Sequence, residues 1–262
     1  MESLSKSRRS VVASLGKKKM RLKHSLFAIE GDKSVSDILF AYPNKFEVNT
    51  VIALSEWIEA NYKELISIGL DQTKIVEATT EDLVKMSSLS TPPEVIAVCR
   101  LPETESIAGR VAPDLYLMLD GIQDPGNMGT IIRTAHWFGI KKIFASHTTV
   151  DLYNPKCIQA SMGSMAAVNV IYTDIKDVIQ SNPSIPAFGL LLEGENIYSA
   201  PLPSSGFIIM GNEGSGLRPE IRQLISKPLT IPPYNPSEHA ESLNVAMATG
   251  ITLAMFRRQQ LK

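Results

Sequence analysis

The stretch LYLMLDGIQDPGNMGTIIRTAHWFGIKKIFAS, residues 115–146, joins two kinds of apolar pattern. Its two ends, LYLMLD and KKIFAS, are short and largely apolar, as in strands that are buried on both faces of a sheet. Between them, Ile131, Ala135 and Phe138 recur at helical spacing, so one face of a helix is expected to pack on that sheet. Strand, helix and strand in this order predict the crossover unit of a mostly parallel sheet.

The same alternation continues to the C-terminus. Residues 113–262 are predicted to form one α/β domain, with further strands at AFGLLLE (187–193), FIIMG (207–211) and LTIPP (229–233). Helices are expected at about 174–181, at 218–226 with Pro219 near the first position, and from about Ser242 to Gln260. The segment 158–172 is rich in small residues, and no helix or strand is predicted there. The expected fold is a mostly parallel sheet with helices on both faces.

Residues 24–100 predict a smaller α/β domain, separated from the larger one by a linker at 101–112 without periodicity. Strands are expected at LFAIEG, TVIAL, KIVEAT and PPEVIAVCR. One helix should begin with Ser55 as its N-cap, and another should open with the capping spacing from Thr79 to Asp82. Aromatic residues are only 6% of the chain, which argues against a base-stacking platform.

Charge is distributed unevenly along a chain whose net charge is −1. Residues 1–23 carry eight basic side chains and one acidic side chain, so this segment is +7 and the remainder is −8. A basic end on a nearly neutral protein favours a polyanionic partner, most simply nucleic acid. A solubilising tail would explain the same cluster equally well.

Composition excludes several other classes. No apolar run approaches the roughly 18 residues of a membrane span, and no apolar segment follows the N-terminal charges, so we expect neither a membrane helix nor a secretory signal. Cys99 and Cys157 lie in apolar surroundings in different predicted domains and are expected to be reduced, as in a cytoplasmic protein. Four scattered histidines and no cysteine pair argue against a structural zinc site.

Three polar loops follow strands of the larger domain, and parallel sheets bind ligands at the carboxyl ends of their strands. The first, DGIQDPGNMGTIIR, places Asn127 where it could cap the helix or contact a ligand. It also places Arg133 off the apolar face, with Gly129 one turn below leaving the guanidinium unobstructed. Taken alone, Arg133 fits a surface arginine paired with a carboxylate.

The second loop, GNEGSG (211–216), is rich in glycine but matches no nucleotide-binding pattern and offers no lysine for a triphosphate. Glu213 within it would repel a phosphate. Either the loop binds a neutral or positively charged ligand, or the Glu213 carboxylate has a structural role and accepts hydrogen bonds from loop amides. The third loop leads into a helix where Ser242 and Asn244 could act as caps or face the crevice. Along that helix a small-residue stripe, Ala246, Gly250 and Ala254, fits burial within the monomer or a homodimer contact.

In this order the motifs N-x-G-x-I-x-R, G-N-E-G-x-G-L and I-P…S-L-N-V-A-x-A-x-G resemble those of the SpoU (TrmH) RNA ribose 2′-O-methyltransferases of the SPOUT superfamily. The smaller domain resembles the substrate-binding domain, similar to ribosomal protein L30e, of members that modify ribosomal RNA. The resemblance implies S-adenosylmethionine as cofactor, methylation of a ribose 2′-hydroxyl, a deep trefoil knot and a homodimer built around it. It favours a guanosine of 23S rRNA as substrate, with no metal and no membrane.

The resemblance also implies roles for individual residues. Arg133 would assist deprotonation of the ribose hydroxyl with an RNA phosphate, and its high pKa makes electrostatic activation a better role than proton acceptance. The remaining catalytic candidates are Asn127, Glu213, Ser242 and Asn244, and the cofactor-binding candidates are Gly211, Gly216, Ile231 and Leu243. The loop PPYNPSEHAE, 232–241, is longer than the I-P-M-x-G type common in the family, so cofactor contacts from it can differ.

Three other functions remain open at this stage. A tRNA substrate is the nearest alternative, and a non-catalytic RNA-binding assembly factor is another, against which the intact motif residues argue. A nucleotide-binding α/β enzyme of a different kind would require a phosphate loop that the sequence lacks.

Overall fold

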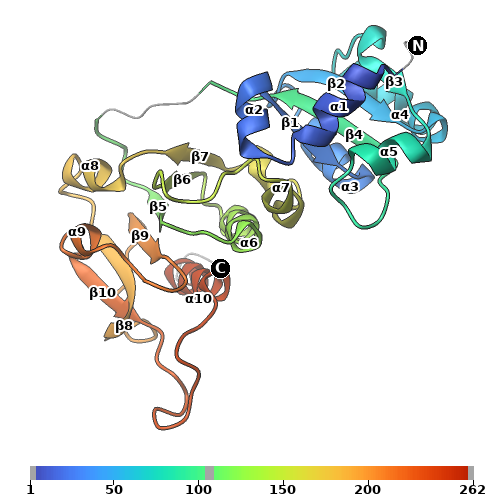
Figure 1. Cartoon of the computed structure of the whole chain (residues 1–262). Helices are drawn as coiled ribbons and strands as arrows, with labels where there is room; N and C mark the ends of the chain where they lie inside the picture. The colour runs from blue at the N-terminus through green and yellow to red at the C-terminus, as the bar shows by residue number, and fades with distance from the viewer. Residues whose placement is uncertain (1–3, 104–108, 259–262) are drawn as a thin grey trace. The chain divides into compact units, whose positions relative to one another are not determined.

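Two β-sheets organise the chain, each in its own compact unit (Figure 1). The computed structural model describes residues 4–103 and 109–258. The first unit comprises residues 1–103 together with 151–166, and the second comprises 104–150 together with 167–262. Part of the predicted linker, 104–108, lies outside the described residues, as do 1–3 and 259–262.

The second unit contains a six-stranded sheet in which every strand pair is parallel. Its strand order is β10-β8-β9-β5-β6-β7. The strands are β5 (Leu115–Asp120), β6 (Lys142–Ala145), β7 (Asn169–Tyr172), β8 (Ala187–Asn196), β9 (Gly206–Gly211) and β10 (Lys227–Thr230). The predicted parallel sheet is therefore confirmed, and all its carboxyl ends lie at one edge.

Helices cover both faces of this sheet, as predicted (Figure 1). On one face Tyr116 and Met118 of β5 pack with α8 (Ile175–Gln180) and α9 (Pro219–Arg222). Alternate β5 side chains point to the opposite face. There α10 (Val245–Arg257) packs along α6 (Pro125–Trp137) and contacts β9. The sheet is buried between these layers, which leaves its carboxyl edge as the place where loops meet.

The second unit differs from the prediction at β7 and at the start of α10. The strand β7 was not predicted, because its sequence follows a run of small residues without a clear period. Helix α10 begins at Val245 instead of about Ser242, since the side chain of Asn244 caps it. The predicted end of this helix at Gln260 lies outside the described residues. Pro219 is at the first position of α9, as expected.

The first unit is built on a four-stranded mixed sheet of order β1-β4-β2-β3. Its strands are β1 (Leu26–Glu30), β2 (Val48–Ala53), β3 (Ile75–Glu77) and β4 (Val95–Arg100). Its other elements are α3 (Asp32–Val35), the π-helical turn η1 (Ser36–Phe40), α4 (Ser55–Ser67), the 3₁₀ turn η2 (Gln72–Lys74) and α5 (Thr80–Met86). The predicted strands and helices of this region are thus present.

One of two predicted helix caps is confirmed. Thr79 and Asp82 form a reciprocal capping box at the start of α5. Ser55, by contrast, is the first residue of α4, and Leu54 occupies the N-cap without a side-chain hydrogen bond. The prediction for Ser55 was therefore wrong, because a serine near a helix start caps it only when its backbone stays outside the helix.

The N-terminal basic segment is not a separate tail. It forms two helices, α1 (Lys6–Ser14) and α2 (Lys18–His24). Val12 and Leu15 are buried in a core cluster with side chains of α5 and of all four strands' inner face. Arg9 pairs with Asp82 at 2.6 Å. The segment is therefore part of the first unit, and its lysines, Lys6, Lys17, Lys18, Lys19 and Lys23, are exposed.

Residues 151–166 also belong to the first unit, although their position in the sequence predicted the second domain. They form α7 (Pro155–Ser161) and the 3₁₀ turn η3 (Ser164–Ala166), and α7 packs on β1. The small residues of this segment permit close packing: a Cβ at Gly163 would lie 2.6 Å from the Cβ of Asp37. Tyr153 packs on Phe27 with ring centroids 4.6 Å apart.

Cys99 and Cys157 are both free and buried, and both lie in the first unit. Burial raises the pKa of each thiol to about 12, so neither is a reactive thiolate. Within the described residues, every helix is too short or too polar to cross a bilayer.

Arg21 is the buried cation of the first unit. Its guanidinium donates to the carbonyl oxygens of Leu15 and Gly16 at 2.7 and 3.0 Å. It also pairs with the carboxylate of Asp151 at 2.6 Å. The Arg21 side chain is 3% exposed, and its charge is neutralised inside the unit. The ion pair links α2 to the start of the 151–166 segment.

Replacing Arg21 with alanine should destabilise the first unit by about 3–5 kcal/mol, because Asp151 would lose its cation in a mostly buried position. Urea denaturation followed by the fluorescence of Trp57, in a Trp137→Phe background, measures this unit. Lys23→Ala changes an exposed residue of the same helix and should cost less than about 0.5 kcal/mol. Equal losses in the two variants would contradict the structural role of Arg21.

Candidate functional site

The N-terminus of α6 is capped by Asp124, whose side chain accepts from the backbone N–H of Asn127 at 2.8 Å. Pro125 occupies the first turn, where its missing N–H costs nothing. Asn127 was predicted either to cap this helix or to contact a ligand. Because Asp124 provides the cap, the amide side chain of Asn127 is left to make contacts beyond the helix.

Those contacts join all three loops. The Asn127 Nδ2 donates to Glu213 Oε1 at 3.0 Å, which reaches the glycine-rich loop. The Asn127 Oδ1 accepts from Asn244 Nδ2 at 2.9 Å, which reaches the start of α10. Asn244 also caps α10, since its Oδ1 accepts from the N–H groups of Ala246 and Met247. A hydrogen-bonded row Asn244–Asn127–Glu213 therefore lies at the carboxyl edge of the sheet.

Glu213 is an anion held by neighbouring donors. Partial desolvation alone would raise its pKa, but hydrogen bonds from the Asn127 side chain and from backbone N–H groups of Glu213, Gln123 and Asp124 together lower it. Gln123 and Asp124 donate to its two oxygens at 3.2 and 3.3 Å. Of the two roles considered for this carboxylate, the structure therefore supports acceptance of loop amides.

Arg133 projects from the exposed side of α6, nearly two turns beyond Asn127. Among the described residues it makes no ion pair and no hydrogen bond, so the surface pair with a carboxylate is not seen. Gly129, expected to leave clearance for Arg133, is itself buried. A guanidinium that has no partner among the described residues can bind an anionic ligand.

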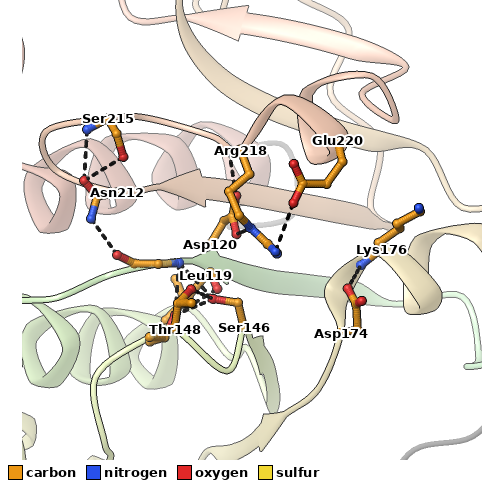
Figure 2. A network of polar contacts seen from close by, with 12 residues as sticks. Leu119, Asp120, Ser146, Thr148, Asp174, Lys176, Asn212, Ser215, Arg218 and Glu220 are labelled. Atoms are coloured by element: carbon orange, nitrogen blue, oxygen red, sulfur yellow. Dashed lines mark hydrogen bonds and ion pairs between the residues drawn. The ribbon is translucent and has the colours of Figure 1, made fainter.

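The glycine-rich loop is held in shape by Asn212, which the sequence analysis did not single out. Its Oδ1 accepts from the N–H groups of Gly214 and Ser215, both at 2.9 Å, while its Nδ2 donates to the carbonyl of Gly121 at 2.7 Å (Figure 2). A Cβ at Gly211 would lie 2.5 Å from the carbonyl carbon of Gly216, so the returning loop packs against the strand end. Gly216 has φ +70°, a conformation that glycine adopts without strain.

Asp120, the last residue of β5, is a second contributor that the sequence analysis missed. Its side chain is completely buried and accepts from the Arg218 backbone N–H at 2.9 Å and from Arg218 Nε at 2.6 Å (Figure 2). Arg218 also pairs with Glu220 at 3.2 Å. The signal that could have found Asp120 is a carboxylate ending an otherwise apolar, fully buried strand.

Three hydroxyl groups, from Ser146, Thr148 and Thr149, form a hydrogen-bonded cluster next to the turn after β5. The Gly121 N–H donates to Ser146 Oγ at 2.9 Å and lies 3.2 Å from Thr149 Oγ1. Ser146 in turn contacts Thr148 at 2.9 Å (Figure 2). Because Asn212 binds the Gly121 carbonyl, both polar groups of this glycine are satisfied, which fixes the turn between β5 and α6.

The third loop runs from the edge strand β10 back to α10. It extends away from the sheet as a long excursion (Figure 1). Ile231, directly after β10, is half-buried, whereas Ser242 and Leu243 are exposed and adjoin Asn244. The Ser242 hydroxyl makes no hydrogen bond within the described residues, so it does not cap α10. The prediction that placed Ser242 within the helix is corrected by the cap at Asn244.

The small-residue stripe of α10 is used within the unit. An added Cβ at Gly250 would meet the Cγ2 of Thr134 on α6 at 3.8 Å, and Ala246 is buried. Asn127 faces Asn244 near the start of both helices, and Arg257 donates to the carbonyl of Phe138 near their ends. The two helices therefore run side by side in the same direction, with Gly250 of the stripe at their contact.

The structure thus joins Asn127, Glu213 and Asn244 directly and places Arg133 on the same helix as Asn127. Gly211 and Gly216 belong to the loop that carries Glu213, and Leu243 adjoins Asn244. Ile231 shares only the carboxyl edge, following β10. Among the described residues, no group of three or more histidine, cysteine, aspartate or glutamate side chains is arranged to hold a metal ion.

Two family profiles match the chain, one in each of its predicted domains. The SpoU rRNA Methylase family matches residues 114–254, which is more than half of the chain. The MRM3-like substrate binding domain matches residues 10–97. The second match includes α2 and part of α1, in agreement with their packing in the first unit.

Relatives extend over nearly the whole length. The Bacillus subtilis (strain 168) protein named 23S rRNA (guanosine(2553)-2′-O)-methyltransferase RlmP is 29% identical over 244 residues, 92% of either chain. A structure described as a putative RNA methyltransferase of the TrmH family from Porphyromonas gingivalis has a TM-score of 0.82 at 33% identity and covers 98% of this chain and 99% of that one.

A second structure, an AdoMet-bound rRNA methyltransferase from Sinorhizobium meliloti, has a TM-score of 0.83 at 25% identity, covering 100% of this chain and 99% of that one. The family profile, the full-length relatives and the three joined loops agree. The chain belongs to the SpoU rRNA methylase family, the S-adenosylmethionine-dependent RNA ribose 2′-O-methyltransferases.

Proposed function

We propose that this enzyme methylates the ribose 2′-hydroxyl of a guanosine in 23S rRNA. The observation that carries the reaction is the row Asn244–Asn127–Glu213, with Arg133, which has no described partner, on the same helix as Asn127. Support for the substrate comes from the Bacillus subtilis relative, whose name gives that nucleotide and which matches 92% of its length. A matching substrate-binding domain at residues 10–97 supports an RNA of the ribosome.

The glycine-rich loop and the third loop fit a cofactor with apolar and positively charged parts. Gly214 and Gly216 expose backbone at the sheet edge, while Ile231 and Leu243 offer apolar side chains that are partly or largely exposed. We assign cofactor contacts to Gly211, Gly216, Ile231 and Leu243. S-adenosylmethionine supplies a methyl group on a positive sulfur, and the nearby anion Glu213 favours positive charge in this region.

Arg133 provides the charge that the acceptor oxygen requires. During transfer the carbon–sulfur bond breaks, a carbon–oxygen bond forms, and the 2′-hydroxyl loses its proton. A guanidinium near that oxygen lowers the pKa of the hydroxyl and stabilises the negative charge that develops as the proton leaves. Arginine is a poor proton acceptor, so the proton passes to an RNA phosphate held by the same guanidinium, or to water.

The other candidates orient these groups. Asn127 fixes α6, and therefore Arg133, relative to the glycine-rich loop through its bond to Glu213. Asn244 ties the third loop to the same point. We assign to Ser242, whose hydroxyl makes no hydrogen bond within the described residues, the role of donating to the ribose or its phosphate. Orientation of this kind contributes to rate because both reactants are held in line.

Replacing Arg133 with alanine should reduce methyl transfer by at least about 100-fold, the scale expected when a group that stabilises developing charge is removed. Binding of S-adenosylmethionine and the melting temperature should stay near those of the wild type, because Arg133 makes no hydrogen bond or ion pair within the described residues. Transfer of a tritiated methyl group to rRNA under single-turnover conditions measures the rate.

Arg222→Ala is the matched control, since Arg222 is another exposed helical arginine of the second unit without a described partner. It should keep the wild-type rate. Full activity of Arg133→Ala would refute the catalytic role proposed for this residue.

We assign RNA docking to the first unit and to the exposed lysines of its N-terminal helices. Arg9 and Arg21 are engaged in internal ion pairs. We assign the phosphate contacts to the exposed lysines of α2 and its N-cap, which are Lys17, Lys18, Lys19 and Lys23. Lysine side chains that bind phosphates release condensed counterions, which makes RNA affinity fall with salt.

Changing these four lysines to glutamine should weaken rRNA binding and reduce the salt slope of log K by about 0.7–0.9 for each lysine that had neutralised a phosphate. The control is Lys33→Gln with Lys85→Gln, since both lysines are exposed in the same unit but pair with carboxylates four residues away. If the four-lysine variant kept the wild-type dependence of log K on salt, these lysines would not bind RNA phosphates and would serve only solubility.

We also propose a homodimer and the knot that the family resemblance implies. The paired helices α6 and α10 expose the apolar side chains of Trp137 and Met247, at 85% and 60% of their surface. Exposed apolar groups of this size favour burial against a second copy. The knot is supported by the path of the third loop, which returns from the edge strand β10 to a helix packed beside the centre of the sheet.

Trp137→Glu should shift the protein from dimer to monomer in light scattering coupled to size-exclusion chromatography, because a charge would be buried at the interface. Val84→Glu changes an exposed apolar residue of the first unit and should leave the mass unchanged. A Trp137→Glu variant that remains a dimer would exclude this surface as the interface.

The proposal also separates the remaining alternatives. Mapping of 2′-O-methyl groups in ribosomal and transfer RNA, with and without the gene, identifies the modified nucleotide, and loss of a tRNA signal alone would overturn the rRNA assignment. The proposed location is the cytoplasm, where two buried thiols stay reduced. If removal of the gene abolished no 2′-O-methyl group in either RNA, and the protein did not bind S-adenosylmethionine, the result would indicate a non-catalytic assembly factor.

A further inference from the structure

The glycine-rich loop 211–216, together with Leu217 and Arg218 after it, is bound at both ends to the end of β5 and the turn that follows β5. At its beginning, Gly211 pairs in register with Asp120, and Asn212 Nδ2 donates to the Gly121 carbonyl at 2.7 Å. At its end, Arg218 donates to both carboxylate oxygens of Asp120 (Figure 2). The shape of the loop therefore depends on the end of β5 as well as on its own glycines.

The bond at the end of the loop is directional. The Arg218 backbone N–H meets Oδ2 at 2.9 Å, and the Nε meets Oδ1 at 2.6 Å, so one residue occupies both oxygens. The carboxylate is completely buried, whereas the Arg218 side chain is 38% exposed. A buried ion pair contributes little net stability compared with apolar packing, but its geometry fixes the backbone that carries it.

Two functional surfaces depend on this backbone. Gly216, two residues before Arg218, closes a bridge with Asn212 by mutual backbone hydrogen bonds of 2.9 and 3.0 Å. Within that bridge lies Glu213, whose carboxylate holds Asn127 on α6. Removal of the Arg218 side chain would therefore loosen the exposed glycine backbone first, and the Asn127 row only through Glu213.

We propose that Asp120 and Arg218 are positioning residues that set the conformation of the cofactor loop, and thereby the affinity for S-adenosylmethionine. This inference rests on the proposed cofactor contacts of the loop. Neither residue touches the acceptor ribose in this scheme, so the effect falls on cofactor binding and not on the transfer step. Glu220, the other partner of Arg218, does not contribute to the bonds between Arg218 and Asp120 and has no part in this role.

The test compares four variants of the full-length protein: Arg218→Ala, Arg218→Gln, Arg218→Lys and Glu220→Gln. Calorimetry measures the Kd of S-adenosylmethionine at a temperature where circular dichroism shows each protein fully folded. Arg218→Ala should raise that Kd by about tenfold or more, the scale of one hydrogen bond between charged groups. Arg218→Lys, which keeps the cation, should recover part of the affinity, and Glu220→Gln should bind like the wild type.

A second readout separates positioning from general damage. At saturating cofactor and RNA, the transfer rate of Arg218→Ala should stay within about threefold of wild type, a change confined to ground-state binding. RNA affinity should not change. Arg218→Gln retains a neutral donor and supplies a folded protein if the alanine variant does not fold.

The inference is overturned if the folded Arg218 variants bind S-adenosylmethionine within about twofold of wild type, or if Glu220→Gln weakens binding as much as Arg218→Ala. It is also overturned if rate and RNA affinity fall together with cofactor affinity. Wild-type protein that binds no S-adenosylmethionine would instead defeat the proposed function itself, so the two failures are distinct.

Discussion

Hydrogen bonds through one side chain, that of Asn127, hold the functional edge of this protein together. Its carbonyl oxygen accepts from Asn244 and its amide donates to Glu213, so three loops far apart in the sequence meet at one residue. This is possible because Asp124 caps α6 and leaves the Asn127 side chain available. An amide can serve both neighbours because it carries a donor and an acceptor, which neither a carboxylate nor a cation offers.

The same edge uses charges in two different ways. Asp120 is buried and bound on both oxygens by Arg218, so its role is to fix the backbone of the glycine-rich loop. Glu213 lies at the surface and is held by an amide and by backbone N–H groups. Arg133, on the same helix as Asn127, is exposed and without a described partner. The edge thus combines polar groups that bind one another with a cation whose charge is not neutralised within the described residues, which is the basis of the catalytic role proposed for it.

Much of the fold could be predicted from the sequence because its signals are local. Apolar strands that alternate with helices indicated the parallel sheet, and the spacing of Thr79 and Asp82 indicated a capping box. The site was predicted less completely. Asn127, Glu213 and Asn244 were found through their motifs, whereas Asn212 and Asp120 were missed. A polar residue at the end of a strand has many possible partners, and only the folded chain selects one.

By itself the sequence determined most of the alternating strands and helices, the three motifs and their family, since these depend on residue type and spacing along the chain. Tertiary structure alone decided that residues 151–166 join the first unit and that Arg21 is buried there. It also decided that the small-residue stripe of α10 serves the contact with α6. Each of these outcomes depends on which surfaces pack together, and packing between distant segments leaves no periodic signal in the sequence.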